Sequence, residues 1–397
     1  MDHEVPDGQT FQQEVSLLHR DMAAPMIVQT SGYYDYYLDH PVELTNLLLG
    51  NQISIEHRFF GTSRPDPADW SKLTIKQMAD DEHVIIAALR EIYGGAFVTT
   101  GGSKGGMTAT YHRRFYPDDV DATVPYVAPI SFGAPDDRYT PFFDTVGTTT
   151  CRTAVRAAAV EMLQNRRAAL ESRAAAQPGH VYTRIALGAA VESSVASLEW
   201  AFWQYYGIDV CDQVPAVSAT DDGMFDFLDT ISPVGDSDDV QVGMFEAYYF
   251  QAYAQLGYPA DNASYLDAFK LYTDTDYNGG LPTGQVPTYD AGAAMRDVDT
   301  FVKTEGDRLL FVYGQWDPWS GGMYDLGNAT DSALFVQPEG THGSRLRRLT
   351  TADRDIAYAK LQSWTGVAVL SPTEKPGRET REPRIPPVMM RGLHSHR

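Results

Sequence analysis

Cysteine is almost absent from this chain of 397 residues, which holds only Cys151 and Cys211. Two cysteines that do not form a C-x-x-C pair cannot by themselves supply the four ligands of a zinc finger, so this class of site is excluded. The two residues are either buried thiols or the two ends of one disulfide that closes a long loop. Their positions alone leave both alternatives open.

Basic residues are also scarce, since 31 Lys and Arg stand against 53 Asp and Glu, a net charge of −22. A chain this acidic repels phosphate backbones, so we expect no nucleic acid partner. No run approaches the roughly 18 consecutive apolar residues of a membrane span, so we expect no membrane partner. Residues 1–7 lack an apolar signal core, which predicts either a cytoplasmic protein or a leader upstream of this chain.

Strand and helix signals alternate in the first third of the chain and again near its end. Short β-branched or apolar runs separated by amphipathic segments are typical of a mostly parallel sheet with helices on both faces. The predicted strands are residues 26–29, 52–56, 96–100, 122–127, 309–313 and 334–336, and the predicted helices are residues 73–93, 107–115 and 351–364.

A helical block interrupts this alternation, with long Ala-rich and aromatic-rich runs at residues 152–176 and 192–206. A helical insertion within a parallel sheet is typical of a lid domain. The predicted organisation therefore has four parts: core residues 1–134, a helical lid at 135–295, core residues 296–370, and a disordered Pro- and Arg-rich tail at 371–397.

A nucleophile is predicted at Ser103, because residues 101–106 read G-G-S-K-G-G between a predicted strand and a predicted helix. A serine on a sharp strand-to-helix turn needs small neighbours so that backbones can approach closely. The segment lacks the spacing of a phosphate-binding loop. In this context the G-x-S-x-G pattern indicates a nucleophilic serine.

The general base and its orienting acid are expected downstream, in the order Ser, Asp, His. Asp317 follows the predicted strand at 309–313, and His342 lies in a Gly-flanked loop after the next predicted strand. Asp325 and Asp331 are competing acids, but neither directly follows a strand. The predicted catalytic residues are therefore Ser103, Asp317 and His342.

Three segments together resemble one family: residues 56–61 (E-H-R-F-F-G), 101–106 (G-G-S-K-G-G) and 316–319 (W-D-P-W). They are similar, in order and spacing, to motifs of the secreted bacterial tripeptidyl aminopeptidases, relatives of prolylcarboxypeptidase and the lysosomal dipeptidyl peptidase. The resemblance implies an α/β-hydrolase fold with a helical lid. It also implies a serine exopeptidase without a cofactor, which releases tripeptides, often with proline before the cut, from free amino termini through an acyl-enzyme.

The resemblance further implies secretion into an oxidising compartment, which favours a disulfide between Cys151 and Cys211. One departure from the family is plain. Its members carry a secretory leader and a first strand ahead of the segment that matches residues 2–3, so this chain is expected to lack that strand.

The oxyanion hole is expected to use the backbone N–H of Lys104, the residue after the nucleophile. The second donor should come from the loop at residues 30–34, where Gly32 and Tyr33 are the candidates. We expect residues 56–58 to hold this loop to the sheet through an ion pair and hydrogen bonds, and to take no part in the chemistry.

An aminopeptidase must also bind a cationic amino terminus, which calls for a carboxylate in the lid. Glu199 is the candidate within an aromatic stretch, with Glu192, Asp209 and Asp212 as alternatives. Either Trp203 or Trp319 could stack on a prolyl ring. The same aromatic stretch could equally be a helix that packs into the lid core.

No metal is expected. Residues 274–279 copy the first half of a calcium loop, but Gln285 stands where such a loop needs Glu. Other functions on the same fold are an esterase, a carboxypeptidase or an inactive binding protein. The oligomeric state does not follow from the sequence.

Overall fold

The computed structural model describes residues 1–370, except residue 6 and residues 37–38, 274–275 and 277–278. These residues form two compact units. The first contains Met1–Ile130, Ala293–Gln315 and residues 323–370. The second contains Ser131–Gly292 together with the short segment Trp316–Gly322. The predicted disordered tail, residues 371–397, lies outside the described residues.

The first unit is built on a seven-stranded sheet with the order β1-β3-β2-β4-β5-β6-β7. Its strands are β1 (Val15–Leu18), β2 (Met26–Thr30), β3 (Asn51–Ile55), β4 (Phe97–Gly102), β5 (Ala122–Tyr126), β6 (Leu310–Gly314) and β7 (Ala333–Gln337). β1 pairs with β3 antiparallel, and all the other pairs are parallel. This sheet confirms the predicted α/β-hydrolase fold.

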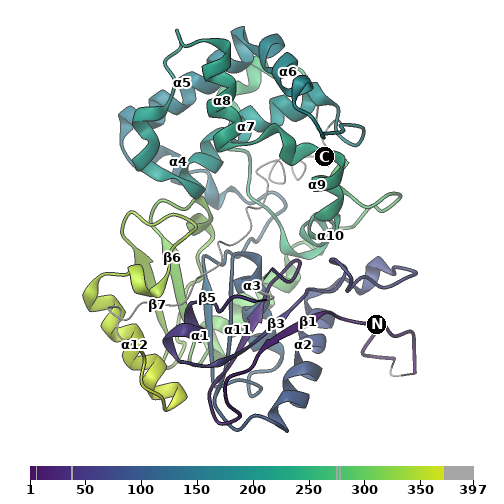
Figure 1. The fold of residues 1–397 in the computed structure, drawn as a ribbon, viewed down its shortest axis with the longest axis vertical. Helices are drawn as coiled ribbons and strands as arrows, with labels where there is room; N and C mark the ends of the chain where they lie inside the picture. Colours follow the sequence, from purple (N-terminus) through teal and green to yellow (C-terminus); the bar gives the residue numbers. More distant parts are fainter. Residues whose placement is uncertain (6, 37–38, 274–275, 277–278, 371–397) are drawn as a thin grey trace. The chain divides into compact units, whose positions relative to one another are not determined.

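Helices cover both faces of the sheet because side chains of a strand alternate between its faces. On one face Ile27, Val98 and Val312 pack with the helices α1 (Glu43–Leu47) and α12 (Thr351–Thr365). On the other face Val28 and Phe97 pack with α2 (Ile75–Arg90). α3 (Lys104–Phe115) contacts α2 and α11 (Ala293–Glu305), so these helices form one layer (Figure 1).

Two details of the core differ from the sequence prediction. The helix expected at residues 107–115 begins at Lys104, directly after Ser103, because the turn between strand and helix is only one residue long. The sheet also has an edge strand, β1, that the alternation did not reveal. This strand has only four residues, and no helix lies between it and β2, so it stands outside the alternation of strands and helices.

The second unit is helical, and its described residues include no β-strand. Its α-helices are α4 (Phe142–Thr145), α5 (Thr149–Asn165), α6 (Arg167–Ala176), α7 (Leu187–Tyr205), α8 (Asp221–Ile231), α9 (Asp239–Met244) and α10 (Glu246–Gln251). The predicted single run at residues 152–176 is wrong, because the chain breaks at Arg166 into α5 and α6. α7 is buried along nearly its whole length and is the central helix of this unit.

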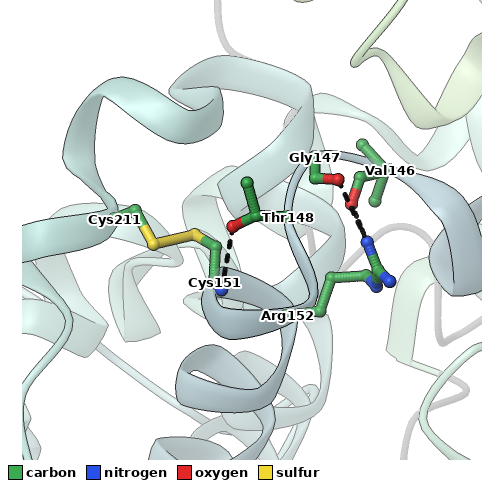
Figure 2. The surroundings of a disulfide bond; sticks show 6 residues. All are labelled: Val146, Gly147, Thr148, Cys151, Arg152 and Cys211. Atoms are coloured by element: carbon green, nitrogen blue, oxygen red, sulfur yellow. Dashed lines mark hydrogen bonds between the residues drawn. A yellow bond between two sulfur atoms is a disulfide. The ribbon is translucent and has the colours of Figure 1, made fainter.

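The predicted disulfide between Cys151 and Cys211 is present. Cys151 lies in the first turn of α5, where its N–H donates to the capping Oγ1 of Thr148 (Figure 2). Cys211 lies in a 3-10 segment, Gly207–Gln213, that follows α7. The bond therefore ties the start of α5 to the chain beyond the end of α7. None of the described helices is long and apolar enough to cross a membrane.

Candidate active site

Ser103 lies on the predicted sharp turn between β4 and α3. Its φ of 53° and ψ of −125° lie in a region that residues with side chains rarely adopt. Its N–H donates to the Tyr126 carbonyl at 2.9 Å, which anchors the turn to β5. Strain of this kind persists only where surrounding structure enforces it, and it is typical of functional sites.

Glycine is required beside Ser103 because backbones meet there at close range. A Cβ on Gly101 would lie 2.4 Å from the carbonyl carbon of Gly105, and one on Gly105 would lie 2.3 Å from the Thr30 carbonyl oxygen. Thr30 Oγ1 also donates to the Gly105 carbonyl at 2.6 Å, so β2 and the start of α3 are locked together. The glycines therefore let the helix begin directly against the sheet.

Asp317 lies three residues beyond the end of β6 and its side chain is fully buried. Its Oδ1 accepts the backbone N–H of Trp319 at 3.2 Å. The competing acids lie elsewhere: Asp331 precedes β7 and pairs with Lys360, and Asp325 is mostly exposed. Only Asp317 among these three follows the carboxyl end of a core strand closely.

His342 lies in the loop after β7, and this loop packs against the end of β6. A Cβ on Gly314, the last residue of β6, would lie 2.5 Å from the carbonyl oxygens of Gly340 and Thr341. The His342 side chain is buried. The loop geometry therefore brings the histidine to the carboxyl end of β6.

Ser103, Asp317 and His342 thus follow the carboxyl ends of three strands, β4, β6 and β7. The strands β4 to β7 are consecutive neighbours and run parallel, so their carboxyl ends lie along one edge of the sheet. Ligand sites of open α/β sheets lie at this edge. A hydrogen-bonded triad of these three residues stays a prediction.

The loop after β2 lies against the start of α3, as an oxyanion loop would. Gly32 has a φ of +72°, and a Cβ on it would lie 2.7 Å from the carbonyl carbon of Lys104. The Tyr33 N–H already donates to Ser31 Oγ at 3.3 Å. Among the described residues no acceptor is recorded for the Gly32 N–H, and the Lys104 N–H is the first of α3 and has no intrahelical acceptor.

Residues 56–58, expected to be structural, do make structural contacts. Glu56 accepts two hydrogen bonds from Ser63 and one from the N–H of Asp35, which holds the loop after β2. Arg58 makes a double hydrogen bond to Asp81 of α2, with both distances at 2.6 Å. These residues form the loop directly after β3.

Glu199, the predicted acceptor of a substrate ammonium group, lies on α7 with its carboxylate fully buried. Its Oε1 accepts the Nε–H of Arg156 at 2.8 Å, and Asn262 approaches Oε2 at 3.5 Å. Burial raises the pKa of Glu199 to about 7, and the nearby Arg156 opposes this shift. The role of Glu199 in binding substrate stays a prediction.

The alternative acids of the second unit differ in accessibility. Glu192 is fully buried and accepts hydrogen bonds from Arg167 and from the backbone N–H of Leu271. Asp209 and Asp212 are exposed. Glu192 is therefore fixed within its helical unit, whereas the two aspartates face water.

The two predicted tryptophans have different surroundings within the second unit. Trp203 is fully buried against Phe202 and Trp316. Trp319, two residues after Asp317, makes edge contacts with Trp200 at 5.2 Å and with Tyr139 at 5.9 Å. Trp200 and Tyr139 were not predicted as neighbours of Trp319, and only the aromatic richness of α7 could have pointed to Trp200.

No group of three or more His, Cys, Asp or Glu side chains in the described part of the chain is placed to hold a metal ion. Most of the calcium-like segment at 274–279 lies outside the described residues. Ser103 and His342 of the first unit thus follow the carboxyl ends of strands of one sheet. A serine and a histidine of this kind suit acyl transfer, and their catalytic roles stay predictions.

Comparison with known proteins agrees with this chemistry. The family model of the PS-10 peptidase S37 family matches residues 1–382. A prolyl tri/tetrapeptidyl aminopeptidase of Streptomyces mobaraensis is 40% identical to this chain over 375 residues, which are 93% of this chain and 79% of that protein.

Solved structures that resemble this chain are more distant. The proline iminopeptidase of Mycobacterium smegmatis is 15% identical, with 88% of this chain and 95% of that chain covered and a TM-score of 0.36. A proline iminopeptidase-related protein of Thermus thermophilus is 13% identical, with 89% and 99% covered and a TM-score of 0.36. Neither likeness is close enough to support a further inference.

Proposed function

The chain belongs to the PS-10 peptidase S37 family of serine peptidases, and from this premise we propose that it releases tripeptides and tetrapeptides from the free amino termini of peptides. Proline is the preferred residue before the cut. The proposal is supported by the 40% identity to a prolyl tri/tetrapeptidyl aminopeptidase along 93% of the chain. The observation that carries the chemistry is Ser103 on its strained turn, between β4 and α3.

In the proposed reaction Ser103 Oγ attacks the carbonyl carbon of the scissile peptide bond. His342 accepts the serine proton and passes it to the leaving amine, while Asp317 orients the imidazole. An acyl-enzyme remains, and water then hydrolyses it with His342 as the base. Neither step needs a cofactor.

The developing oxyanion is proposed to accept hydrogen bonds from the backbone N–H groups of Lys104 and Gly32. Gly32 is favoured over Tyr33, because the Tyr33 N–H is already used by Ser31 Oγ. Both favoured donors lie on segments that are packed against each other, so they are preorganised before substrate binds.

The substrate ammonium group is proposed to bind Glu199. Its Oε1 is taken by Arg156, but Oε2 has only the long contact from Asn262 and can accept a stronger donor. Asp209 and Asp212, both exposed, are the alternatives. A charge-assisted bond of this kind contributes about 1.5–3 kcal/mol, which is roughly 10-fold to 150-fold in binding.

A preference for proline is proposed to come from Trp319, whose neighbours Trp200 and Tyr139 fix the indole in an aromatic cluster. A prolyl ring packs well on such a surface. A secreted location is also proposed, because the Cys151–Cys211 disulfide is typical of proteins from oxidising compartments.

A panel of chromogenic peptides with two, three and four residues, each with a free and an acetylated amino terminus, tests the proposal. We expect cleavage of the free tri- and tetrapeptides that end in proline, with kcat/KM lowered 10-fold or more by acetylation. Equal rates on free and acetylated peptides would instead indicate an esterase or endopeptidase. Cleavage from the carboxyl terminus would indicate a carboxypeptidase. If no peptide is cleaved and Ser103 does not react with a fluorophosphonate, the chain is an inactive binding protein.

A further inference from the structure

The side chain of Lys104 points into the protein and not toward solvent. Lys104 is the first residue of α3 and its side chain is almost completely buried. Its Nζ donates a hydrogen bond to the backbone carbonyl of Gly32 at 2.7 Å. The amine also lies over the rings of Tyr33 and Phe60, at 5.4 Å and 5.6 Å from their centres. The side chain of Lys104, the residue that follows the proposed nucleophile, therefore contacts the loop after β2.

This placement is costly for a lysine. Burial removes water from an ammonium group, and the first turn of a helix is the end where positive charge is unfavourable. Burial accordingly lowers the pKa of Lys104 well below its usual range, and only the nearby Glu82 opposes the shift. Burial likewise raises the pKa of Glu82, whose Oε2 has no hydrogen-bond partner among the described residues. A lysine that is buried at a cost in free energy of folding points to a role other than stabilising the fold.

Residues on either side of Gly32 make hydrogen bonds to groups other than the Lys104 amine. Thr30 Oγ1 is bonded to the Gly105 carbonyl, and Ser31 Oγ donates to the Tyr33 carbonyl at 2.8 Å. The Gly32 carbonyl is bonded to the Lys104 amine alone among the recorded contacts. Glycine at a positive φ has the widest conformational freedom of any residue, so this is the position at which the loop most needs an external constraint.

We propose that the side chain of Lys104 is a positioning residue for the oxyanion hole, with its amine holding the Gly32 carbonyl so that the Gly32 N–H keeps its place beside the Lys104 N–H. The inference rests on the proposed function, since it assigns no reaction of its own. An ammonium and a neutral amine can both donate this hydrogen bond, so the constraint persists in either protonation state.

Lys104→Met tests the proposal, because methionine has a similar length and is apolar but cannot hold the carbonyl. Loss of one oxyanion donor costs about 10²–10³ in kcat. Lys104→Met displaces the Gly32 N–H but does not remove it, so we expect a smaller loss. The kcat should fall roughly 10-fold to 100-fold, and KM should stay within about 3-fold of the wild-type value. Inhibition by a peptidyl boronate, which mimics the tetrahedral intermediate, should weaken by a similar factor. Inhibition by the released tripeptide should not change.

The melting temperature of Lys104→Met distinguishes a positioning role of this side chain from a structural one. Since the variant removes a buried amine, we expect its melting temperature to be equal to or higher than that of the wild type. Lys76→Met, on the half-exposed face of α2, is the matched control and should leave kcat and boronate inhibition unchanged. All rates are divided by the concentration of sites that react with a fluorophosphonate, so misfolded protein is not counted.

The proposal is overturned if kcat per reactive site stays within about 3-fold of wild type, or if kcat and KM change without weaker boronate inhibition. If Lys104→Met does not fold, Lys104→Leu, which also lacks a hydrogen-bond donor, replaces it. Failure of both variants to fold would show that the side chain is structural and would likewise overturn the proposal. A wild-type protein that cleaves no peptide would instead refute the proposed function.

Discussion

Ser103, the proposed nucleophile, has a backbone conformation that only its surroundings can enforce. The residue has a positive φ, and it is held by the Tyr126 carbonyl on one side and by the packed glycines 101 and 105 on the other. This turn presents the hydroxyl at the carboxyl edge of the sheet and lets the helix begin at once. In the proposed reaction, the first N–H groups of α3 would face the negative charge that develops on the substrate oxygen.

Ser103→Ala should abolish peptidase activity without unfolding the protein. Removal of the nucleophile costs about 10⁴-fold or more in kcat, because triad members act as a unit. The measurement is kcat on a free tripeptide substrate, with circular dichroism as the check on folding. A variant that retained a tenth of the wild-type turnover would exclude Ser103 as the nucleophile.

Gly105→Ala should destabilise the protein, since its Cβ would lie 2.3 Å from the Thr30 carbonyl oxygen. Overpacking against backbone costs about 1–3 kcal/mol or more in the free energy of unfolding. Gly94→Ala is the matched control, because nothing lies within 4 Å of its added Cβ. Urea denaturation of both variants measures the difference, and equal stabilities would contradict the close approach of β2 to α3.

At the scale of elements, the helical unit is organised around α7, which is buried from Ala189 to Gln204. Two of its acids, Glu192 and Glu199, are buried and neutralised by Arg167 and Arg156. Helices α5 and α6 therefore pack on α7 partly through ion pairs, and the disulfide fixes the start of α5.

Removal of the disulfide should destabilise this unit strongly. The bond joins residues 60 apart in sequence, and a loop of this length contributes about 4 kcal/mol in the chain-entropy model. Cys151→Ser with Cys211→Ser should therefore lower the free energy of unfolding by up to that amount, measured by urea denaturation under non-reducing conditions. If the double variant and the wild type unfold at the same urea concentration, the bond does not constrain the unfolded chain.

Glu199 should make stability depend on pH. Burial raises its pKa in the folded state to about 7, above the usual value near 4.5, so the folded state binds the proton more tightly. The stabilisation is fully present below about pH 4.5 and is lost as the pH rises through about 7. Between pH 5 and pH 8 the wild type should lose about 2 kcal/mol relative to Glu199→Gln.

Urea denaturation of the wild type and Glu199→Gln at both pH values measures this difference. The comparison removes the contributions of all other titrating groups, since both proteins share them. A difference that does not change with pH would mean that Arg156 keeps Glu199 ionised throughout this range.

At the scale of the whole molecule, the fold could be read from the sequence because it depends on local patterns, and the same patterns predict the catalytic residues. The parallel strands contain short β-branched or apolar runs, and the G-x-S-x-G segment lies where a strand gives way to a helix. The disulfide between Cys151 and Cys211 could be predicted only through the family resemblance, because the spacing of the two cysteines is equally compatible with free thiols.

The rest depends on contacts between distant segments, which no local pattern records. Arg156 pairs with Glu199 from another helix, and Tyr139 reaches Trp319 from far along the chain. The break at Arg166 interrupts a sequence with good helix formers throughout, so propensity predicted one helix. The burial of the Lys104 side chain could not be predicted from the sequence either, because lysine is ordinarily exposed.

Peptide mapping of the protein after reaction with a fluorophosphonate tests most directly the claim that this peptidase uses Ser103 as its nucleophile. The reagent phosphonylates a serine only where a base and an oxyanion hole activate it. We expect one adduct per chain, on the peptide that contains Ser103, and none in Ser103→Ala. An adduct on any other residue, or an active enzyme that acquires none, would contradict the account.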